Sequence, residues 1–271
     1  MLTMDSGLRI EQMIKGLKSL STLMTPKVNS AKRIPRAQIS IKGLFQLRGG
    51  QCVACLEPHA HFGLCTPCRQ DLPANHSHCR CCALPIAYAG DELICGQCLK
   101  DPPPFSRIVA PWRYRFPVDG MVQRYKYNGQ RAYARPLIQD LSTHLTLMLE
   151  THPERTPDLL LASPMHPARR RKRGFNQAAD IAEHISRQSG IPWSADLVVR
   201  NRRTRPQRGL NREERLANLR GIYQVTRIPP ASIAIVDDVV TTGATARSLT
   251  EVLLEAGARE VQIWALARTP G

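Results

Sequence analysis

The stretch Ile233-Ala234-Ile235-Val236-Asp237-Asp238-Val239-Val240-Thr241-Thr242-Gly243-Ala244-Thr245 determines how the rest of this chain is interpreted. Its first four residues are apolar and mostly β-branched, which is typical of a buried parallel strand. Two adjacent carboxylates follow, where we expect the strand to end. Small side chains, hydroxyls and free backbone N–H groups come next, just before a helical pattern begins.

A strand, a short glycine-containing loop and a helix N-terminus together form an anion site, because the loop amides and the positive end of the helix dipole point at the ligand. Two acids beside it suggest a sugar phosphate. The alternative is a strand–turn–helix junction whose Asp and Thr residues only cap the helix. Adjacent acids and three threonines around one glycine exceed what a cap needs. The stretch resembles the phosphoribosyl-pyrophosphate (PRPP) motif of type I phosphoribosyltransferases.

The positive charge of the chain is concentrated in two segments. The 271 residues carry a formal net charge of +16. Residues 1–50 hold nine basic and two acidic residues, residues 161–228 hold fifteen and five, and the rest nets −1. Such concentration indicates polyanion partners, of which PRPP is one and nucleic acid another. The length fits one or two domains, and 42% hydrophobic residues can build a core.

The sequence predicts a cytoplasmic protein. It contains no run of about 18 apolar residues, so we expect no transmembrane helix. The N-terminus lacks the hydrophobic core of a secretion signal. Residues 1–50 combine an amphipathic pattern with prolines and scattered cations, and we expect a basic, flexible extension without an assigned function.

Nine cysteines lie between residues 52 and 98, and in a reducing cytosol they are metal ligands sooner than disulfides. Eight form four C-x2-C knuckles: Cys52 and Cys55, Cys65 and Cys68, Cys79 and Cys82, Cys95 and Cys98. Two knuckles complete a closed four-thiolate site, so residues 51–101 predict a double zinc ribbon with two Zn²⁺ ions. Sequential and cross-braced pairing both remain open, and Cys81 looks spare. Closed sites leave no position for a substrate, so a structural role is favoured.

Residues 105–271 alternate between strand and helix patterns, which predicts an α/β domain with a largely parallel sheet. The apolar run Leu159–Ala162 reads as a second buried strand and leads into Pro164, Met165 and His166. Five consecutive cations, Arg169 to Arg173, follow. Because ligands of open α/β sheets bind outside the carboxyl ends of the strands, we expect a pyrophosphate loop here. A solvated basic turn is the alternative.

Residues 200–220 are densely basic, and Pro206 and Gly209 oppose a helix at their start. We expect a mobile loop from Arg202 to Gly209 and a short helix from Asn211. The loop is a candidate lid or nucleic-acid track. Its residues are Arg202, Arg203, Arg205, Gln207, Arg208 and Arg212.

The chain from Cys52 to Arg268 resembles the ComF family within the type I phosphoribosyltransferases. The matching pieces are the cysteine knuckles, Lys126-Tyr127-x-Gly129, Arg173-Gly174-Phe175-Asn176-Gln177, Gln207-x-Gly209-Leu210 with Arg215-x-x-Asn218, and the PRPP motif. Two departures stand out. The first 50 residues exceed the usual family start, and Ser163-Pro164-Met165-His166 replaces the Pro-Val-Pro-Leu of relatives.

The resemblance implies a role for each site residue. Asp237 and Asp238 would hold the ribose hydroxyls of PRPP, and the residues from Thr241 to Thr245 its 5′-phosphate. Pro164, Met165 and His166 would meet the pyrophosphate, helped by Arg169, Arg173 or Lys126. Mg²⁺ would bridge pyrophosphate oxygens and ribose hydroxyls.

Three functions follow from these patterns. The favoured one is a PRPP-binding protein that also binds single-stranded DNA and acts in DNA uptake during natural transformation, with DNA-uptake or recombination proteins as partners. In the second, nucleic-acid binding is the function and the PRPP site is a sensor or a structural relic. The third is a metabolic phosphoribosyltransferase that transfers the phosphoribosyl group with loss of pyrophosphate. No residue identifies an acceptor or a catalytic group.

Overall fold

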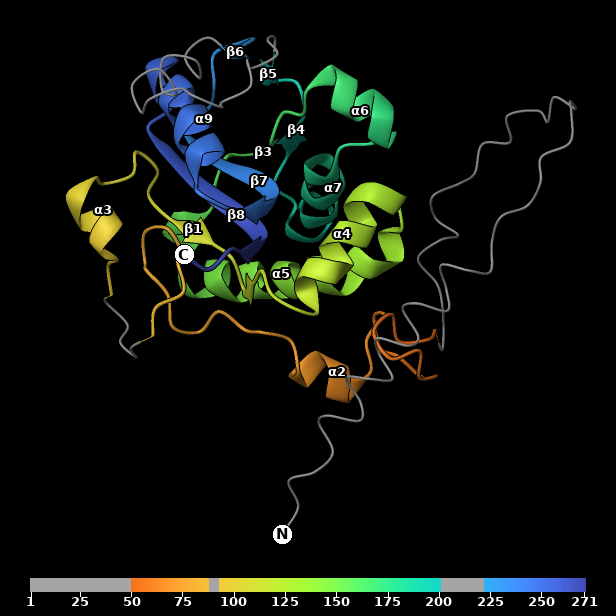
Figure 1. Cartoon of the computed structure of the whole chain (residues 1–271). Helices are drawn as coiled ribbons and strands as arrows, with labels where there is room; N and C mark the ends of the chain where they lie inside the picture. Colours follow the sequence, from red (N-terminus) through yellow and green to blue (C-terminus); the bar gives the residue numbers. More distant parts are fainter. Residues whose placement is uncertain (1–49, 88–92, 201–221) are drawn as a thin grey trace, which may run out of the picture. The chain divides into compact units, whose positions relative to one another are not determined.

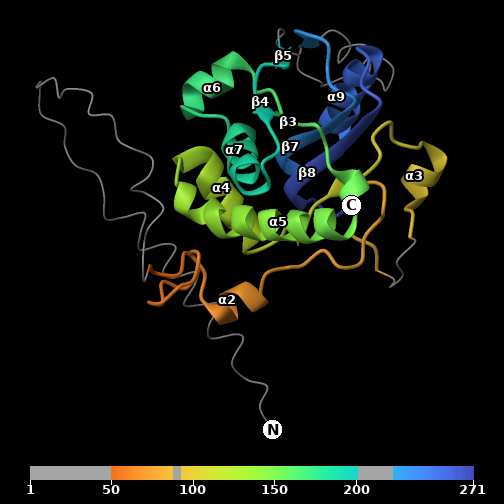
Figure 2. The same cartoon turned by 180° about the vertical axis from the view of Figure 1, so that it is seen from behind.

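The computed structural model describes residues 50–87, 93–200 and 222–271 (Figures 1 and 2). The chain divides into two compact units, Met1–Asp71 and Leu72–Gly271. The N-terminal extension expected over residues 1–50 lies outside the described residues except for Gly50. None of the described helices is both long enough and apolar enough to cross a bilayer.

Strand β7 (Ser232–Val240) is the centre of the six-stranded sheet formed by the described residues of the second unit. Its neighbours are β3 (Leu159–Ala162) and β8 (Glu260–Arg268). The outer strands are β1 (Ile108–Val109) and β2 (Trp112–Arg113), both on β8, and β4 (Trp193–Ser194) on β3. Every pairing in this sheet is parallel, which confirms the predicted sheet.

One expectation about the central strand is wrong. β7 does not end before its two acids but continues through Asp237 and Asp238 to Val240. The cause is the neighbouring strand, since β8 pairs with β7 from Ser232↔Glu260 to Val240↔Arg268. Pairing along this length satisfies backbone groups that the polar residues would otherwise leave exposed.

The helices of the second unit cover both faces of the sheet. The longer ones are α4 (Val118–Asn128), α5 (Arg131–Thr151), α6 (Pro167–Arg173), α7 (Gln177–Ser189) and α9 (Ala244–Glu255). α7 packs against β3 and β7, and α9 packs against β8. Figures 1 and 2 show α9 on one side of the sheet and α4, α5 and α7 on the other. Buried Ile233, Ile235 and Ile263 of the sheet and Leu249 and Leu253 of α9 belong to one apolar cluster.

The strand order reverses between β3 and β7. From β3 the chain passes through α7 to β4 on one side, and from β7 it passes through α9 to β8 on the other. Ligands of open parallel sheets bind at such a reversal, outside the carboxyl ends of the strands. The loops that follow β3 and β7 are therefore the expected location of a ligand-binding site.

A separate antiparallel pair lies beside the main sheet. β5 (Val198–Arg200) pairs with β6 (Tyr223–Val225), and Arg200 lies opposite Tyr223. The predicted lid or nucleic-acid track connects these two strands and lies outside the described residues. Its members are Arg202, Arg203, Arg205, Gln207, Arg208 and Arg212.

Candidate functional site

The eight predicted zinc ligands form two groups of four in the described chain. One group is Cys52, Cys55, Cys65 and Cys68, and the other is Cys79, Cys82, Cys95 and Cys98. Within each group the sulfur atoms lie within 4.8 Å of one another. The knuckles therefore pair sequentially, and cross-braced pairing is not observed among the described residues.

Both groups fit a tetrahedral zinc ion. The Sγ atoms of Cys55 and Cys65 are 3.6 Å apart, and those of Cys82 and Cys95 are 3.7 Å apart. Four sulfurs at the usual Zn–S distance would be about 3.8 Å from one another. Cys81 belongs to neither group; its carbonyl oxygen accepts a hydrogen bond of 2.9 Å from Ile108 N. Four cysteines complete each group and leave no open position, which is the arrangement typical of structural zinc sites.

The two groups share a local design. Cys65 precedes helix α2 (Thr66–Gln70), and Cys95 precedes helix α3 (Gly96–Lys100). Cys95 N also donates to Cys79 Sγ at 3.3 Å. The first group lies in the unit Met1–Asp71, whereas the second lies in the unit that contains the sheet.

The loop after β7 has the features of an anion site. Gly243 has a φ of 78°, a left-handed conformation that favours glycine, and it directly precedes the 12-residue helix α9. Thr241, Thr242, Ala244 and Thr245 are exposed, and backbone N–H groups at the start of a helix are typical donors to an anion. Ala244 N donates to Thr242 Oγ1 at 3.4 Å.

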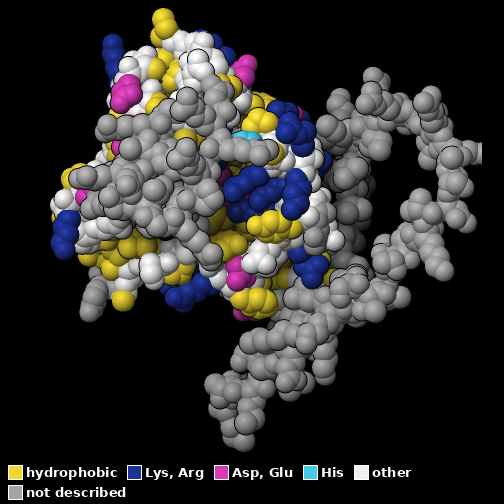
Figure 3. Space-filling model, turned by 45° about the horizontal axis from the view of Figure 1, so that its top comes forward, with side chains coloured by type: hydrophobic (Ala, Val, Ile, Leu, Met, Phe, Trp, Pro, Cys, Tyr) yellow, Lys and Arg dark blue, Asp and Glu magenta, His cyan; other side chains and the backbone are white. Residues whose placement is uncertain are grey.

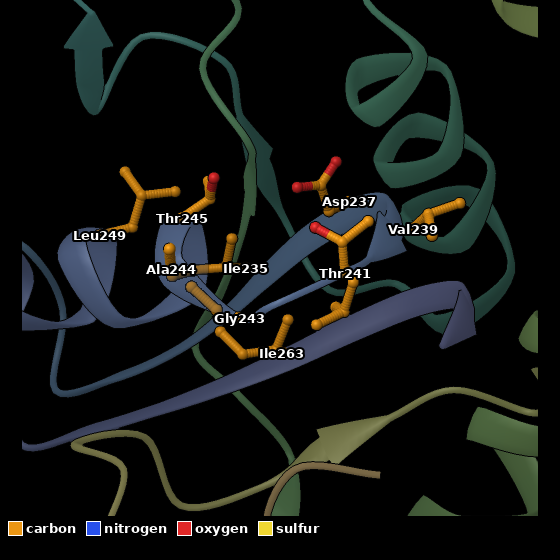
Figure 4. Close-up of a pocket in the computed structure, with 11 residues that line it drawn as sticks. Ile235, Asp237, Val239, Thr241, Gly243, Ala244, Thr245, Leu249 and Ile263 are labelled. Atoms are coloured by element: carbon orange, nitrogen blue, oxygen red, sulfur yellow. The ribbon is translucent and has the colours of Figure 1, made fainter. Parts of the chain in front are cut away.

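This loop borders a pocket at the end of the central strand. Figure 4 shows Asp237 and Thr245 pointing to the same side of it, with Thr241 and Gly243 on the loop between them. The pocket is lined by Ile235, Asp237, Val239, Val240, Thr241, Gly243, Ala244, Thr245, Ala246, Leu249 and Ile263. The geometry brings one predicted carboxylate together with the predicted phosphate loop.

The two acids lie in different surroundings, because neighbouring side chains on a strand point to opposite faces of the sheet. Asp237 lines the pocket on the α9 side, and its Oδ1 accepts Asp238 N at 2.8 Å. Asp238 is buried and forms an ion pair of 2.9 Å with Lys126 Nζ of α4. Burial and then the neighbouring Asp238 charge raise the pKa of Asp237 to about 7, although Lys126 and Ser163 act in the opposite direction.

The cations after β3 form a helix, and the basic turn considered from the sequence is not observed. His166 Nδ1 accepts Ala168 N at 3.1 Å, which caps α6 at its start, and Gly174 with a φ of 81° ends it. Four cations of α6 are exposed: Arg169, Arg170, Arg171 and Lys172. Lys and Arg side chains gather on the face drawn in Figure 3.

The loop before α6 stays close to the central strand. Ser163 N donates to Val236 O of β7 at 2.9 Å, and Asn176 Nδ2 donates to Ser163 O at 3.1 Å. Pro164 is buried, while Met165 and His166 are half-buried. The predicted pyrophosphate residues therefore come directly after β3, the strand that pairs with β7 and its two acids.

Two motifs named from the sequence pack against each other. Tyr125 is buried, and its hydroxyl donates to Gln177 O at 3.2 Å. Its ring lies 5.4 Å from that of Phe175, and Gln177 Nε2 donates to Lys126 O at 3.5 Å. The contacts between residues 125–129 and residues 173–177 thus hold Lys126 in place beside its partner Asp238.

A cation–aromatic pair faces solvent beside these contacts. The Arg173 guanidinium carbon lies 5.1 Å from the centroid of the Tyr127 ring, and Arg173 Nη1 donates to Gln177 Oε1 at 3.2 Å. Tyr127 is 71% exposed. A planar ring with a cation beside it can stack a base and neutralise its phosphate.

Sequence reasoning missed two residues at the site, Tyr223 and Arg268. Tyr223 is buried on β6, with the Arg200 guanidinium carbon 5.9 Å from its ring centroid. Burial raises the pKa of its hydroxyl, on which Arg200, Asp237 and Thr245 also act. No motif marks Tyr223. Arg268 is buried at the end of an apolar strand, an unusual place for arginine that gives a usable signal.

Comparisons with known proteins agree with these features. A family model described as "Double zinc ribbon domain" matches residues 47–99. The "DNA utilization protein YhgH" of Escherichia coli (strain K12) is 32% identical over 228 residues, covering 81% of this chain and 97% of that protein. "Competence protein F" of Haemophilus influenzae is 31% identical, covering 80% and 96%. "Competence protein ComFC" of Streptococcus pneumoniae is 29% identical over 160 residues, covering 59% and 67%.

Proposed function

The chain belongs to the ComF family, and from this premise we propose that it binds PRPP with Mg²⁺ across the carboxyl ends of β3 and β7. The observation that carries the proposal is the meeting of two acids, an open phosphate loop and a row of cations where the strand order reverses. PRPP offers the matching groups: two ribose hydroxyls, a 5′-phosphate and a pyrophosphate.

Each group of the ligand has a counterpart at the site. The loop from Thr241 to Thr245 receives the 5′-phosphate through backbone N–H groups and hydroxyls. Asp237 and Asp238 accept the ribose hydroxyls. The pyrophosphate meets Pro164, Met165 and His166, with Arg169, Arg173 and Lys126 supplying charge. In the structure without ligand Lys126 pairs with Asp238, so binding would exchange that pair for contacts with PRPP.

Mg²⁺ fits this donor set, because it takes oxygen ligands and is held mainly through substrate phosphates and water. When bound, it would neutralise charge on the leaving pyrophosphate. The residues of the chain would orient the ribose, hold the pyrophosphate with cations and limit access of water. Transfer of the phosphoribosyl group to an acceptor would make the protein a phosphoribosyltransferase, and a metabolic enzyme of this class is the alternative function.

The described surface also favours single-stranded DNA as a partner. Four exposed cations on α6 lie next in sequence to the Arg173–Tyr127 pair, which combines phosphate neutralisation with an exposed stacking ring. The relatives carry the names "DNA utilization protein" and "Competence protein". These names support the proposal that the protein acts in DNA uptake during natural transformation, in the cytoplasm and with DNA-uptake or recombination proteins. The cations of residues 202–212, which lie outside the described residues, are proposed as further DNA contacts.

The test of the proposed function is titration calorimetry of the zinc-loaded protein with PRPP and Mg²⁺. The same titration with a single-stranded oligonucleotide tests the second ligand. If PRPP fails to bind, the proposed site is wrong whatever the oligonucleotide does.

A further inference from the structure

Arg268 connects the second cysteine group to the phosphate loop. The side chain is buried at the end of β8. Its Nε donates to Cys82 O at 2.9 Å, and its Nη1 donates to Val240 O at 3.2 Å and to Thr241 O. One planar guanidinium therefore bridges a zinc ligand and the first residue of the loop.

Arg247 makes a second connection from the other end of the loop. It lies in the first turn of α9, and its backbone N donates to Gly243 O at 2.9 Å. Its Nη2 donates to Asp101 O at 2.7 Å, and its Nη1 donates to Pro102 O at 3.4 Å. Asp101 follows α3, the short helix that carries the zinc ligand Cys98.

Both arginines have acceptors close to cysteines of the second group: Arg268 donates to Cys82 O, and Arg247 donates to Asp101 O and Pro102 O and pairs with Asp101 Oδ2 at 3.4 Å. A zinc ion bound by that group would therefore determine where these acceptors lie. Cys82 O belongs to a ligand residue, and a four-thiolate site fixes the backbone of its ligands. A buried guanidinium needs its acceptors in place, since an unsatisfied buried charge is costly. Ala83, next to Cys82, is part of the apolar cluster under the sheet. These hydrogen bonds all lie within residues 72–271.

We propose that the second zinc site holds the phosphate loop in its binding conformation through Arg268 and Arg247, which are positioning residues. Loss of zinc from Cys79, Cys82, Cys95 and Cys98 would loosen residues 241–245, whereas loss of zinc from the first group would not. The identity of the anion rests on the proposed PRPP function, but the coupling between metal and loop does not.

The experiment compares Cys95→Ser with Cys65→Ser in the full-length chain. The two cysteines are matched, because each is a zinc ligand that directly precedes a five-residue helix. Zinc content should fall from two ions to one in both variants. Hydrogen–deuterium exchange is then followed without ligand in peptides covering residues 240–247, where hydrogen-bonded amides such as Arg247 N, which donates to Gly243 O, report the conformation of the loop. Cys95→Ser should speed exchange there by about tenfold or more, and Cys65→Ser should leave it unchanged. Peptides from β3 and α7 report any global unfolding.

Arg268→Lys keeps the positive charge but cannot bridge Cys82 O and Thr241 O with one planar group. It should loosen the same loop peptide while both zinc ions stay bound. In that background Cys95→Ser should add less to loop exchange than it does in the native chain. The proposal is overturned if loop exchange stays slow in a folded Cys95→Ser variant, if both cysteine variants affect it equally, or if Arg268→Lys has no effect. Because the readout needs no ligand, absence of PRPP binding would overturn only the proposed function.

Discussion

Lys126 Nζ lies 2.9 Å from Asp238 Oδ1, and both side chains are more than four-fifths buried. This pair joins the helix α4 to the central strand β7 at the carboxyl edge of the sheet. It explains why the sequence contains both the Lys126-Tyr127 motif and, more than a hundred residues later, the two adjacent acids Asp237 and Asp238: the two motifs meet in the fold. The cation holds one acid of the site and is available to an anionic ligand.

The first prediction concerns this ion pair. Lys126→Met leaves Asp238 buried without its counter-charge, so the free energy of unfolding in urea should fall by about 1–3 kcal/mol. PRPP affinity should fall about 10–100-fold, because the pyrophosphate is deprived of a neighbouring cation. Lys126→Arg should keep most of both. Unchanged PRPP affinity in Lys126→Met would remove Lys126 from the pyrophosphate site.

The second prediction concerns pH. Burial and the neighbouring Asp238 charge raise the pKa of Asp237 to about 7, compared with about 3.9 in an unfolded chain. Between these values the folded protein holds a proton that the unfolded chain has released. Stability contributed by this group is therefore present at low pH and is lost as pH rises through the window, by up to about 1.4 kcal/mol per pH unit.

Urea denaturation across that window measures the effect. Asp237→Asn should flatten the decline of unfolding free energy with pH, because the amide does not titrate. An equal slope in the native protein and in Asp237→Asn would show that the pKa of Asp237 is not raised in the folded state.

The third prediction separates the spare cysteine from the ligands. Cys81→Ser should retain two zinc ions per chain, since Cys81 lies in neither group and contributes its carbonyl oxygen to Ile108 N. Cys82→Ser should lose one ion. Zinc content measured by atomic emission decides between them. Loss of zinc in Cys81→Ser with retention in Cys82→Ser would exchange their roles.

The fourth prediction concerns single-stranded DNA. Tyr127→Ala should weaken oligonucleotide binding about 5–100-fold at fixed salt, because stacking contributes about 1–3 kcal/mol per base. Tyr127→Phe keeps the ring and should bind like the native protein. Fluorescence anisotropy with a labelled oligonucleotide makes the comparison, and equal binding by the alanine and phenylalanine variants would exclude stacking on this ring.

The same measurement tests the cations of α6. Replacing Arg170, Arg171 and Lys172 with alanine should make binding less salt-dependent, by about 0.7 in the slope of log K against log salt for each phosphate that is no longer neutralised. Arg259→Ala is the control for removal of an exposed cation, since it lies before β8 at the opposite edge of the sheet. An unchanged slope in the triple variant would show that these three cations of α6 do not contact the DNA phosphates.

The sequence predicted those elements whose formation depends on neighbouring residues, such as apolar strands and cysteine knuckles. Leu159–Ala162 and Ile233–Val236 are apolar runs, and both are strands of the parallel sheet. The cysteine spacing predicted two zinc sites because a C-x2-C turn presents both sulfurs to one ion. The helix α6 was missed although its signals were present: Pro167 at the first helical position and Gly174 after the end.

Features that depend on distant partners could not be predicted in this way. The extension of β7 through its acids requires β8, and the two faces that the acids occupy follow from that extension. Tyr223 reaches Thr245 only through the packing of β6 beside α9. The acceptors of Arg268 come from residues 82, 240 and 241, which no short motif joins.

Binding of PRPP by the two acids and the loop after β7 is the central proposal. Titration calorimetry with PRPP and Mg²⁺ compares the native protein with the variant that carries both Asp237→Asn and Asp238→Asn. We expect saturable binding of one PRPP per chain that requires Mg²⁺ and is lost in the double variant while both zinc ions remain. No binding to the native protein, or equal binding to the double variant, would contradict the proposal.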